Sequence, residues 1–260
     1  MGVGVKESTL RVGDVALSVL EGGTGQPLLV LHAAGGAGLW LPYHELLAQR
    51  YRVIAPDSPS FGRSAESEVV DGVDDLAFLY ADLLEQLELD DLIVVGSSFG
   101  GWVAAELAVL ASSEFISKLV LIDPIGLRIP DAPIGDLFAM NPAQKMAALF
   151  HDPAVAAAMF PAQPDVEVIM AFYRDEMAFA RYAWSPFCCN PKLVRRLHRI
   201  SAPTLVLWGE HDRLVPRQHG ERYAERIPNA RLEIIAGSGH AVMMEKPKEA
   251  IDAIERFLRP

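Results

Sequence analysis

Short apolar runs alternate along the chain with longer stretches in which apolar residues recur every three or four positions. This alternation is typical of a parallel β-sheet covered by helices, so it predicts the α/β class. The short runs are almost unbroken in valine, isoleucine and leucine, which indicates strands that are buried on both faces. They cover residues 28–31, 51–55, 91–96, 118–122, 204–208 and 231–235.

Helical spacing is clearest over residues 71–89, where the leucines follow a period close to 3.6 residues. Residues 9–20 instead alternate around Gly13-Asp14, which predicts an antiparallel hairpin ahead of the parallel strands. Further helices are expected over residues 102–110, 217–226 and 247–258.

The alternation breaks once, between Asp123 and Thr204, where 80 residues contain no convincing buried strand. We expect a helical insertion over one end of the sheet, the cap segment (residues 124–203). The core is then formed by residues 1–123 and 204–260. Helical pieces of the cap segment are expected near residues 143–150, 165–181 and 192–199.

Residues 96–100 read Gly-Ser-Ser-Phe-Gly, a G-x-S-x-G pattern between an apolar strand and a helix. A tight turn at this point would present the Ser98 hydroxyl at the carboxyl end of the strand, above a helix N-terminus, as a nucleophile requires. A turn that holds a phosphate is the alternative, but the loop has no lysine and lacks G-x-x-x-x-G-K. Ser97 is the second serine here, and a small structural residue beside the turn is the favoured interpretation for it.

A serine needs a base, and His240 is the favoured one of seven histidines. It follows Gly237-Ser238-Gly239, after the last strand and before the final helix. His32 ends the strand over residues 28–31, where we expect it to bond loop backbone. His44 is expected on a solvated helix face. Exposed or capping roles are expected for His151, His198, His211 and His219.

The base in turn needs a carboxylate that fixes its tautomer. Asp212 lies in the loop after the strand over residues 204–208, and Asp123 ends the strand before the cap segment. Either residue would preserve the chain order serine, acid, histidine. We favour Asp212, and Asp123 remains the second candidate.

The oxyanion that forms when a serine attacks a carbonyl needs preorganised donors. One should be the backbone N–H of Phe99, directly after the nucleophile. Ala34, in the small-residue loop over 32–36, is the expected second donor. An ordinary glycine-rich connection is the alternative for that loop.

Together these residues resemble the α/β-hydrolase superfamily over essentially the whole chain. The resemblance implies a mostly parallel eight-stranded sheet with helices on both faces and a helical cap after strand six. It also implies Ser98, Asp212 and His240 as a catalytic triad. Two positions depart from the family pattern, because Ala33 and Ser60 stand where glycine is usual. The matching pieces are Leu31-His32 with its loop, Pro56-Asp57, residues 61–64 and 96–100, Gly209 through Asp212 to Pro216, and Gly239-His240.

Within that superfamily the chain is similar to esterases, and from Asn190 to His240 also to meta-cleavage-product hydrolases, which cut a carbon–carbon bond. The latter commonly carry tryptophan after the catalytic histidine, where this chain has Ala241. The resemblance thus leads us to expect a serine hydrolase that cleaves a small ester or related acyl substrate through an acyl-enzyme. No metal or organic cofactor is expected.

Three other functions remain open. A carbon–carbon bond hydrolase of vinylogous diketone acids would need an arginine near the site, with Arg174, Arg181 and Arg195 as candidates. A ligand receptor would keep the triad and turn over slowly. A cofactor-independent oxygenase or lyase could use the same scaffold.

Apolar side chains of the cap segment suggest an apolar pocket, although most of them could simply pack the cap onto the core. Phe138, Trp184 and Phe187 are the predicted substrate contacts. The wider set comprises Phe138, Met140, Phe150, Met159, Phe160, Phe172, Met177, Trp184 and Phe187.

A formal charge of −11 argues against nucleic-acid binding and against docking on an anionic membrane. The cap segment carries 8 basic and 7 acidic residues, so the acidity belongs to the core and a carboxylate substrate stays open.

Adjacent Cys188 and Cys189 give neither a disulfide framework nor metal-ligand spacing. With no signal peptide visible, we expect a cytoplasmic protein that acts on a small molecule; the oligomeric state cannot be inferred.

Overall fold

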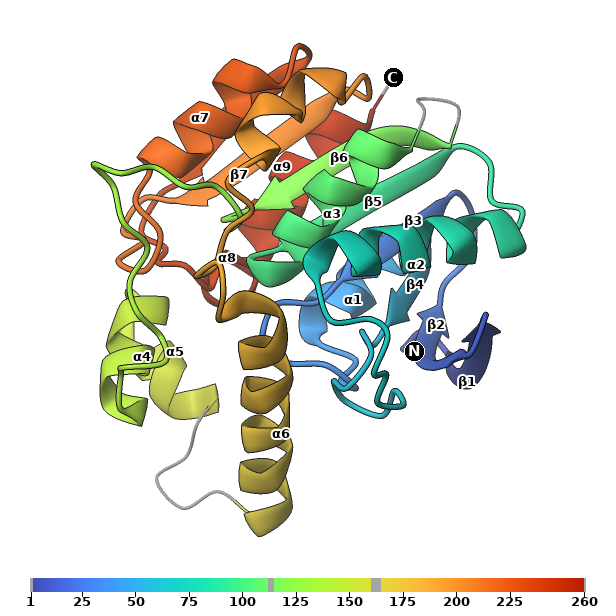
Figure 1. Cartoon of the computed structure of the whole chain (residues 1–260), viewed down its shortest axis with the longest axis horizontal. Helices are drawn as coiled ribbons and strands as arrows, with labels where there is room; N and C mark the ends of the chain where they lie inside the picture. Colours follow the sequence, from blue (N-terminus) through green and yellow to red (C-terminus); the bar gives the residue numbers. More distant parts are fainter. Residues whose placement is uncertain (1, 112–114, 160–164, 260) are drawn as a thin grey trace.

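The computed structural model describes residues 2–111, 115–159 and 165–259, and its centre is an eight-stranded sheet (Figure 1). The strand order is β1-β2-β4-β3-β5-β6-β7-β8, and every pairing from β4 to β8 is parallel. Strands β1 and β2 form an antiparallel hairpin at one edge. The strands are β1 Val5–Val12, β2 Val15–Gly22, β3 Pro27–Leu31, β4 Arg52–Pro56, β5 Leu92–Ser97, β6 Ile116–Ile122, β7 Thr204–Gly209 and β8 Ala230–Ile235.

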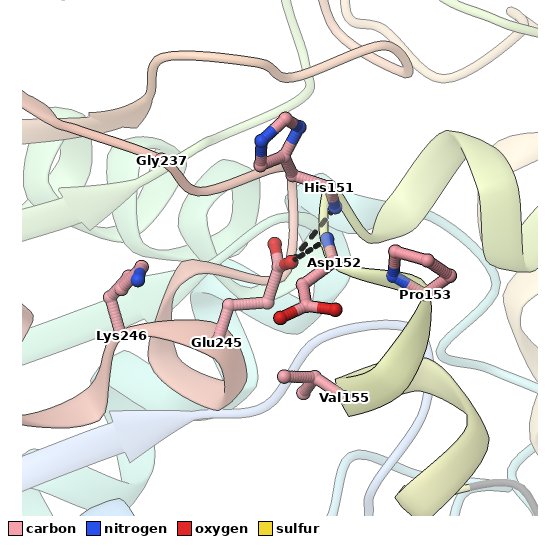
Figure 2. A pocket seen from close by; sticks show the side chains of 7 residues that line it. All are labelled: His151, Asp152, Pro153, Val155, Gly237, Glu245 and Lys246. Atoms are coloured by element: carbon pink, nitrogen blue, oxygen red, sulfur yellow. Dashed lines mark hydrogen bonds between the residues drawn. The ribbon is translucent and has the colours of Figure 1, made fainter.

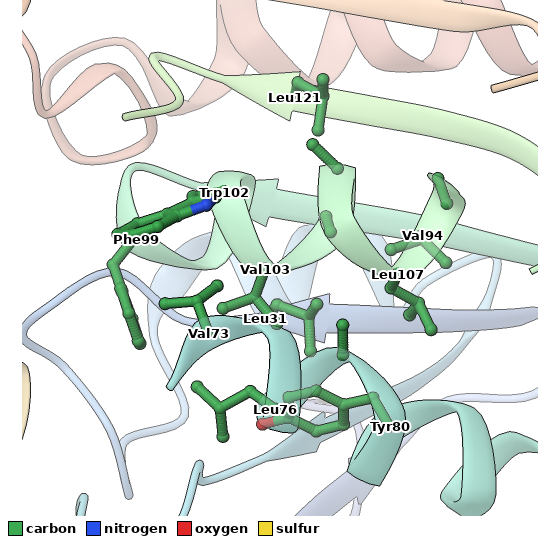
Figure 3. Close-up of a cluster of buried hydrophobic side chains, with 14 of the residues drawn as sticks. Leu31, Val73, Leu76, Tyr80, Val94, Phe99, Trp102, Val103, Leu107 and Leu121 are labelled. Atoms are coloured by element: carbon green, nitrogen blue, oxygen red, sulfur yellow. The ribbon is translucent and has the colours of Figure 1, made fainter. Parts of the chain in front are cut away.

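Helices cover both faces of the sheet, as alternating strand side chains require. Leu29 and Leu31 of β3 belong to the larger apolar cluster, with α2 (Val73–Gln86) and α3 (Phe99–Leu110). Figure 3 shows part of this cluster, in which side chains of α2 lie beneath those of α3. Leu28 and Val30 point to the other face, which α1 (Pro42–Leu47), α8 (Val242–Glu245) and α9 (Pro247–Leu258) cover.

The predicted fold is confirmed, since all six predicted parallel strands and the hairpin are present. The hairpin strands are longer than expected and together span residues 5–22. Helix α7 (Gln218–Arg226) and helix α9 match the helices predicted over residues 217–226 and 247–258.

The described part of the segment between β6 and β7 contains helices, as predicted. It contains α4 (Pro142–Leu149), α5 (Pro153–Met159) and α6 (Val166–Ala183), and α6 projects from the body of the molecule in Figure 1. The structure corrects two details, because α5 was not predicted and residues 192–199 form two 3-10 turns, Leu193–Arg195 and Leu197–Arg199. Within the described residues, no helix is long and apolar enough to cross a membrane.

His44 contradicts its prediction, since only 3% of it is exposed. Its helix α1 packs against α9, and the Nδ1 atom of His44 accepts a hydrogen bond from the Leu41 N–H at 3.0 Å. Burial lowers the pKa of His44 to about 4, because a charged imidazolium is costly away from water. His219 is also buried, with its Nε2 atom 2.8 Å from the Ala132 carbonyl oxygen, whereas His198 and His211 are exposed.

Candidate active site

Ser98 occupies the sharp turn between β5 and α3. Its backbone has φ 53° and ψ −110°, a conformation that a non-glycine residue adopts only when its surroundings enforce it. The neighbouring glycines explain how the turn closes. A Cβ atom on Gly96 would lie 2.3 Å from the Gly100 carbonyl oxygen, and one on Gly100 would lie 2.1 Å from the Leu31 carbonyl oxygen. The G-x-S-x-G pattern therefore reflects close backbone packing around the serine.

His240 reaches Ser98 from the loop that follows β8. Its Nε2 atom lies 2.8 Å from the Ser98 Oγ atom, and its Nδ1 atom lies 2.8 Å from an Asp212 carboxylate oxygen. The Asp212 contact requires a proton on Nδ1, because a carboxylate can only accept. Nε2 is then free to accept the serine proton, which is the tautomer that a general base needs.

Asp212 is itself held firmly in the loop after β7. Its Oδ1 atom accepts hydrogen bonds of 2.8 Å from the backbone N–H groups of Leu214 and Val215. Its Oδ2 atom faces His240, and only 1% of the side chain is exposed. Three donors thus converge on this carboxylate and hold it in one orientation.

Asp123, the second candidate for the acid, does not contact the serine or take the place of Asp212 at Nδ1. It lies at the end of β6, fully buried, and its Oδ1 atom accepts a 2.8 Å hydrogen bond from the Gly209 N–H. Burial raises the pKa of Asp123 well above its usual range, and the neighbouring Asp212 charge raises it further. Of the two predicted candidates, Asp212 is the one that is hydrogen-bonded to the histidine.

Asp123, Asp212 and His240 each have one potential ligand atom, and these atoms lie within 4.8 Å of one another. Such a group could in principle hold a metal ion. The Nδ1 atom of His240 and the Oδ2 atom of Asp212 already bind each other, however. The closeness of the three groups is therefore accounted for by the hydrogen-bonded pair and its carboxyl neighbour.

The expected oxyanion donors lie beside the turn. The N–H of Phe99 starts α3, so the helix itself supplies no acceptor for it. The loop after β3 lies against the first turn of α3, as the Gly100 packing shows, and Ala34 in this loop is partly buried. Both assignments stay predictions.

His32 has the structural role predicted for it. Its Nε2 atom accepts a 3.0 Å hydrogen bond from the buried Ser58 N–H, so its Nδ1 atom carries the proton and donates to the Ala33 carbonyl oxygen at 2.6 Å. The ring therefore fastens the loop after β3 to the loop after β4.

Phe179 is a residue near the site that the sequence analysis missed. It lies on the buried face of α6, and its ring meets the Phe99 ring edge-on, with centroids 5.6 Å apart. The Phe138 ring stacks on the Phe179 ring, with centroids 5.3 Å apart. The predicted substrate residues Trp184 and Phe187 both contact Phe138, at 5.3 and 5.9 Å. An aromatic chain thus runs from the nucleophile turn into the cap segment.

The members of the predicted apolar set differ in exposure. Trp184 is 65% exposed and Met177 is 75% exposed, so both lie at the outside of the cap segment. Phe150 is buried, and Phe160 lies outside the described residues. The substrate roles of Phe138, Trp184 and Phe187 stay predictions.

The arginines proposed to face the site are all exposed. Arg174 directs its guanidinium to the Gly62 carbonyl oxygen at 3.1 Å, and Arg181 and Arg195 lie on the surface. The charged group that α6 buries is instead Asp175, whose carboxylate accepts a 3.1 Å hydrogen bond from the Gly62 N–H. Burial raises the pKa of Asp175.

Glu245 joins the histidine loop to the cap segment, another feature that sequence inspection missed. Its Oε1 atom accepts hydrogen bonds from the N–H groups of His151 at 2.8 Å and Asp152 at 2.7 Å (Figure 2). Its Oε2 atom accepts from the Gly239 N–H at 2.6 Å, next to His240. One carboxylate therefore fixes both segments, at the edge of a pocket of about 390 Å³.

This chain is similar to known hydrolases in both sequence and fold. A family model described as "Alpha/beta hydrolase family" matches residues 28–253. The 2-hydroxy-6-oxo-6-phenylhexa-2,4-dienoate hydrolase of Comamonas testosteroni is 29% identical, over 98% of this chain and 95% of its own. A serine hydrolase involved in carbazole degradation, the CarC enzyme, superposes with a TM-score of 0.76 at 25% identity, covering 98% and 99%. A bacterial membrane phospholipase A reaches a TM-score of 0.78 at 25% identity, covering 98% and 86%.

Proposed function

Because this chain belongs to the α/β-hydrolase family, we propose that it is a serine hydrolase that cleaves a small ester through an acyl-enzyme. The observation that carries the proposal is the continuous contact from Asp212 through His240 to Ser98, with both distances at 2.8 Å. A histidine that bonds a buried carboxylate on one side and a serine hydroxyl on the other is the arrangement that activates the hydroxyl for acyl transfer.

In the proposed mechanism, the Ser98 oxygen attacks the ester carbonyl while the Nε2 atom of His240 takes its proton. Asp212 stabilises the resulting imidazolium and keeps the ring oriented. The N–H groups of Phe99 and Ala34 stabilise the oxyanion. His240 then passes its proton to the leaving alkoxide, and a water molecule that His240 activates hydrolyses the acyl-enzyme.

The surroundings of the site favour an uncharged, apolar substrate. The cap segment meets the nucleophile turn with the Phe179 ring, and Phe138 extends this surface. The candidate arginines for a carboxylate are exposed, and the carboxyl group that α6 buries is that of Asp175. An ester with an apolar acyl or alcohol group is therefore the substrate class that we propose, with the cap segment (residues 124–203) as its selector.

Carbon–carbon bond hydrolysis is the second candidate, and the observation that favours it is the set of relatives. Enzymes named as hydrolases of 2-hydroxy-6-oxo-dienoates are 27–29% identical to this chain. The same serine, histidine and aspartate could serve that reaction. Ala241, in the place where the resemblance leads us to expect tryptophan, counts against it.

A substrate panel separates the two candidates. Purified protein is given p-nitrophenyl acetate and butyrate, and in parallel a coloured 2-hydroxy-6-oxo-dienoate, with Ser98→Ala as the control. We expect multiple turnover on the esters, none with Ser98→Ala, and slower loss of the dienoate colour. Faster turnover of the dienoate would favour the second candidate. A burst of one equivalent without further turnover would indicate the slow receptor instead.

A further inference from the structure

Asp123 is a buried acid that the triad chemistry does not use. It directly follows β6, none of its surface is exposed, and its backbone has φ 43°. Left-handed backbone costs free energy in any residue that carries a side chain, although aspartate tolerates it better than most. Asp123 has this unfavourable backbone conformation where its carboxyl group lies close to that of Asp212. A role for the carboxyl group itself is therefore indicated.

The two oxygens of Asp123 have different surroundings. Oδ1 accepts the 2.8 Å hydrogen bond from the Gly209 N–H, which ties the end of β6 to the end of β7. Oδ2 is buried and has no donor within hydrogen-bonding distance in the described part of the chain. A charged oxygen in that state would be costly, whereas a protonated one could donate a hydrogen bond.

The acceptor for such a proton is close by. A carboxyl oxygen of Asp123 lies within 4.8 Å of both an Asp212 oxygen and a His240 ring nitrogen. Two carboxylates at that separation in a buried site do not both ionise. Asp212 holds three donors, from Leu214, Val215 and His240, whereas Asp123 holds one. The charge therefore belongs on Asp212 and the proton on Asp123.

The other charged groups around Asp123 act in the same direction. Burial is the main cause that raises the pKa of Asp123, followed by the charge of Asp212, and the charge of Glu245 raises it further. The Gly209 N–H lowers the pKa but does not outweigh these causes.

We propose that Asp123 is a neutral carboxylic acid whose Oδ2–H donates a hydrogen bond to the Asp212 carboxylate and so positions Asp212 for His240. The inference rests on the proposed function, since it concerns the same triad. Asp123 is a positioning residue, because it acts on substrate only through Asp212. The pair then carries a single negative charge, and the carboxyl ends of β6 and β7 are joined through their side chains as well as through the sheet.

Two substitutions separate a neutral donor from a charged acid. In Asp123→Asn, the amide oxygen can still accept from Gly209 and the amide N–H can donate to Asp212. We expect kcat/KM for p-nitrophenyl butyrate to stay within about threefold of the parent enzyme. Asp123→Ala removes the donor, and we expect a fall of roughly 10- to 100-fold, mostly in kcat, because Asp212 loses one of the hydrogen bonds that orient it toward His240.

The pH profile and infrared spectrum report on the charge directly. A neutral Asp123 means that Asp123→Asn leaves the acid limb of kcat/KM in place, since no charge is removed near His240. It also means that the carbonyl stretch of a protonated carboxylic acid, measured at pH 7 in D₂O, disappears in Asp123→Asn. Circular dichroism and thermal unfolding check that each variant is folded.

Three results would overturn the inference: no protonated-acid band that depends on Asp123, an acid limb that moves to lower pH in Asp123→Asn, or equal losses in the Asn and Ala variants. If Asp123→Ala does not fold, the Asn variant and the infrared band still decide. Failure of the triad itself has a different signature, because Ser98→Ala would then keep activity while the Asp123 band is unaffected.

Discussion

The Nε2 atom of His240 lies 2.8 Å from the Oγ atom of Ser98, although 142 positions separate the two residues along the chain. Ser98 and His240 follow strands β5 and β8, which end at the same edge of the sheet with β6 and β7 between them. The carboxyl ends of parallel strands lie at one edge of a sheet, so the topology of the sheet brings Ser98 and His240 together. The contact depends on both side chains, and each can be tested separately.

Ser98→Ala should lower kcat for a p-nitrophenyl ester by at least about 10⁴-fold, because no other hydroxyl contacts His240 Nε2 within the described residues. Steady-state kinetics and thermal unfolding measure the effect and confirm the fold. Ser97→Ala is the matched control and should retain activity. If the Ser97 variant loses as much as the Ser98 variant, the nucleophile is misassigned.

Asp212→Asn should cost roughly 10³- to 10⁴-fold in kcat, since the histidine loses the carboxylate that fixes its tautomer and stabilises its positive charge. Asp123→Asn should cost far less. Parallel kinetics of the two variants test the choice of acid. A reversed order of the two losses would make Asp123 the acid of the triad.

Glu245→Gln should lower both stability and activity. A glutamine side chain has one oxygen that can accept and one NH₂ group that can only donate. The NH₂ group would therefore face backbone N–H donors, either those of His151 and Asp152 or that of Gly239. We expect about 2 kcal/mol of lost unfolding free energy by urea titration, and a reduced kcat.

The control for this substitution is Glu249→Gln, because Glu249 is exposed on α9, four residues further along the chain. Its unfolding free energy and kcat should match those of the parent. Equal behaviour of the two variants would show that Glu245 does not join the cap segment to the histidine loop.

Ser60→Gly should raise the unfolding free energy by about 1 kcal/mol, since Ser60 has φ 71° and its buried hydroxyl has no partner within the described residues. The resemblance implies glycine at this position, so the substitution restores the family pattern. Urea unfolding measures the change. As a contrast, Gly62→Ala should destabilise, because its Cβ atom would lie 2.3 Å from an Asp57 carboxylate oxygen.

His44 should make stability depend on pH between about 6.5 and 4. Its pKa in the folded protein is lowered to about 4, mainly by burial, so the unfolded chain binds its proton first as the pH falls. Stability from this residue is complete above pH 6.5 and is lost toward pH 4, by up to about 3 kcal/mol.

Unfolding free energies of His44→Asn across that range should therefore fall less steeply with decreasing pH, while the Asn oxygen can still accept from the Leu41 N–H. His198→Asn, at an exposed position, is the control and should keep the parent slope. Parallel curves for the His44 variant and the parent would contradict the assignment.

The sequence alone predicted the sheet and the serine, histidine and aspartate that meet in the structure, because strand ends and glycine spacing are local signals. It could not predict the environment of a side chain on a short helix. His44 lies in a six-residue helix whose buried face is set by α9, more than 200 residues later. Phe179 was missed because an aromatic residue on an amphipathic helix looks like ordinary packing until its partner Phe99 is known.

Gly239 adds a consequence for the exchange of caps between relatives. A Cβ atom there would lie 2.7 Å from the His151 nitrogen and 2.9 Å from the Leu149 carbonyl oxygen, and Ala241 donates a hydrogen bond to that same oxygen. Replacing residues 124–203 with the cap of a relative would therefore remove the backbone that packs against the loop of His240. A chimera with the cap of a relative should keep residues 149–152 of this chain. The exchangeable part is therefore smaller than the cap segment.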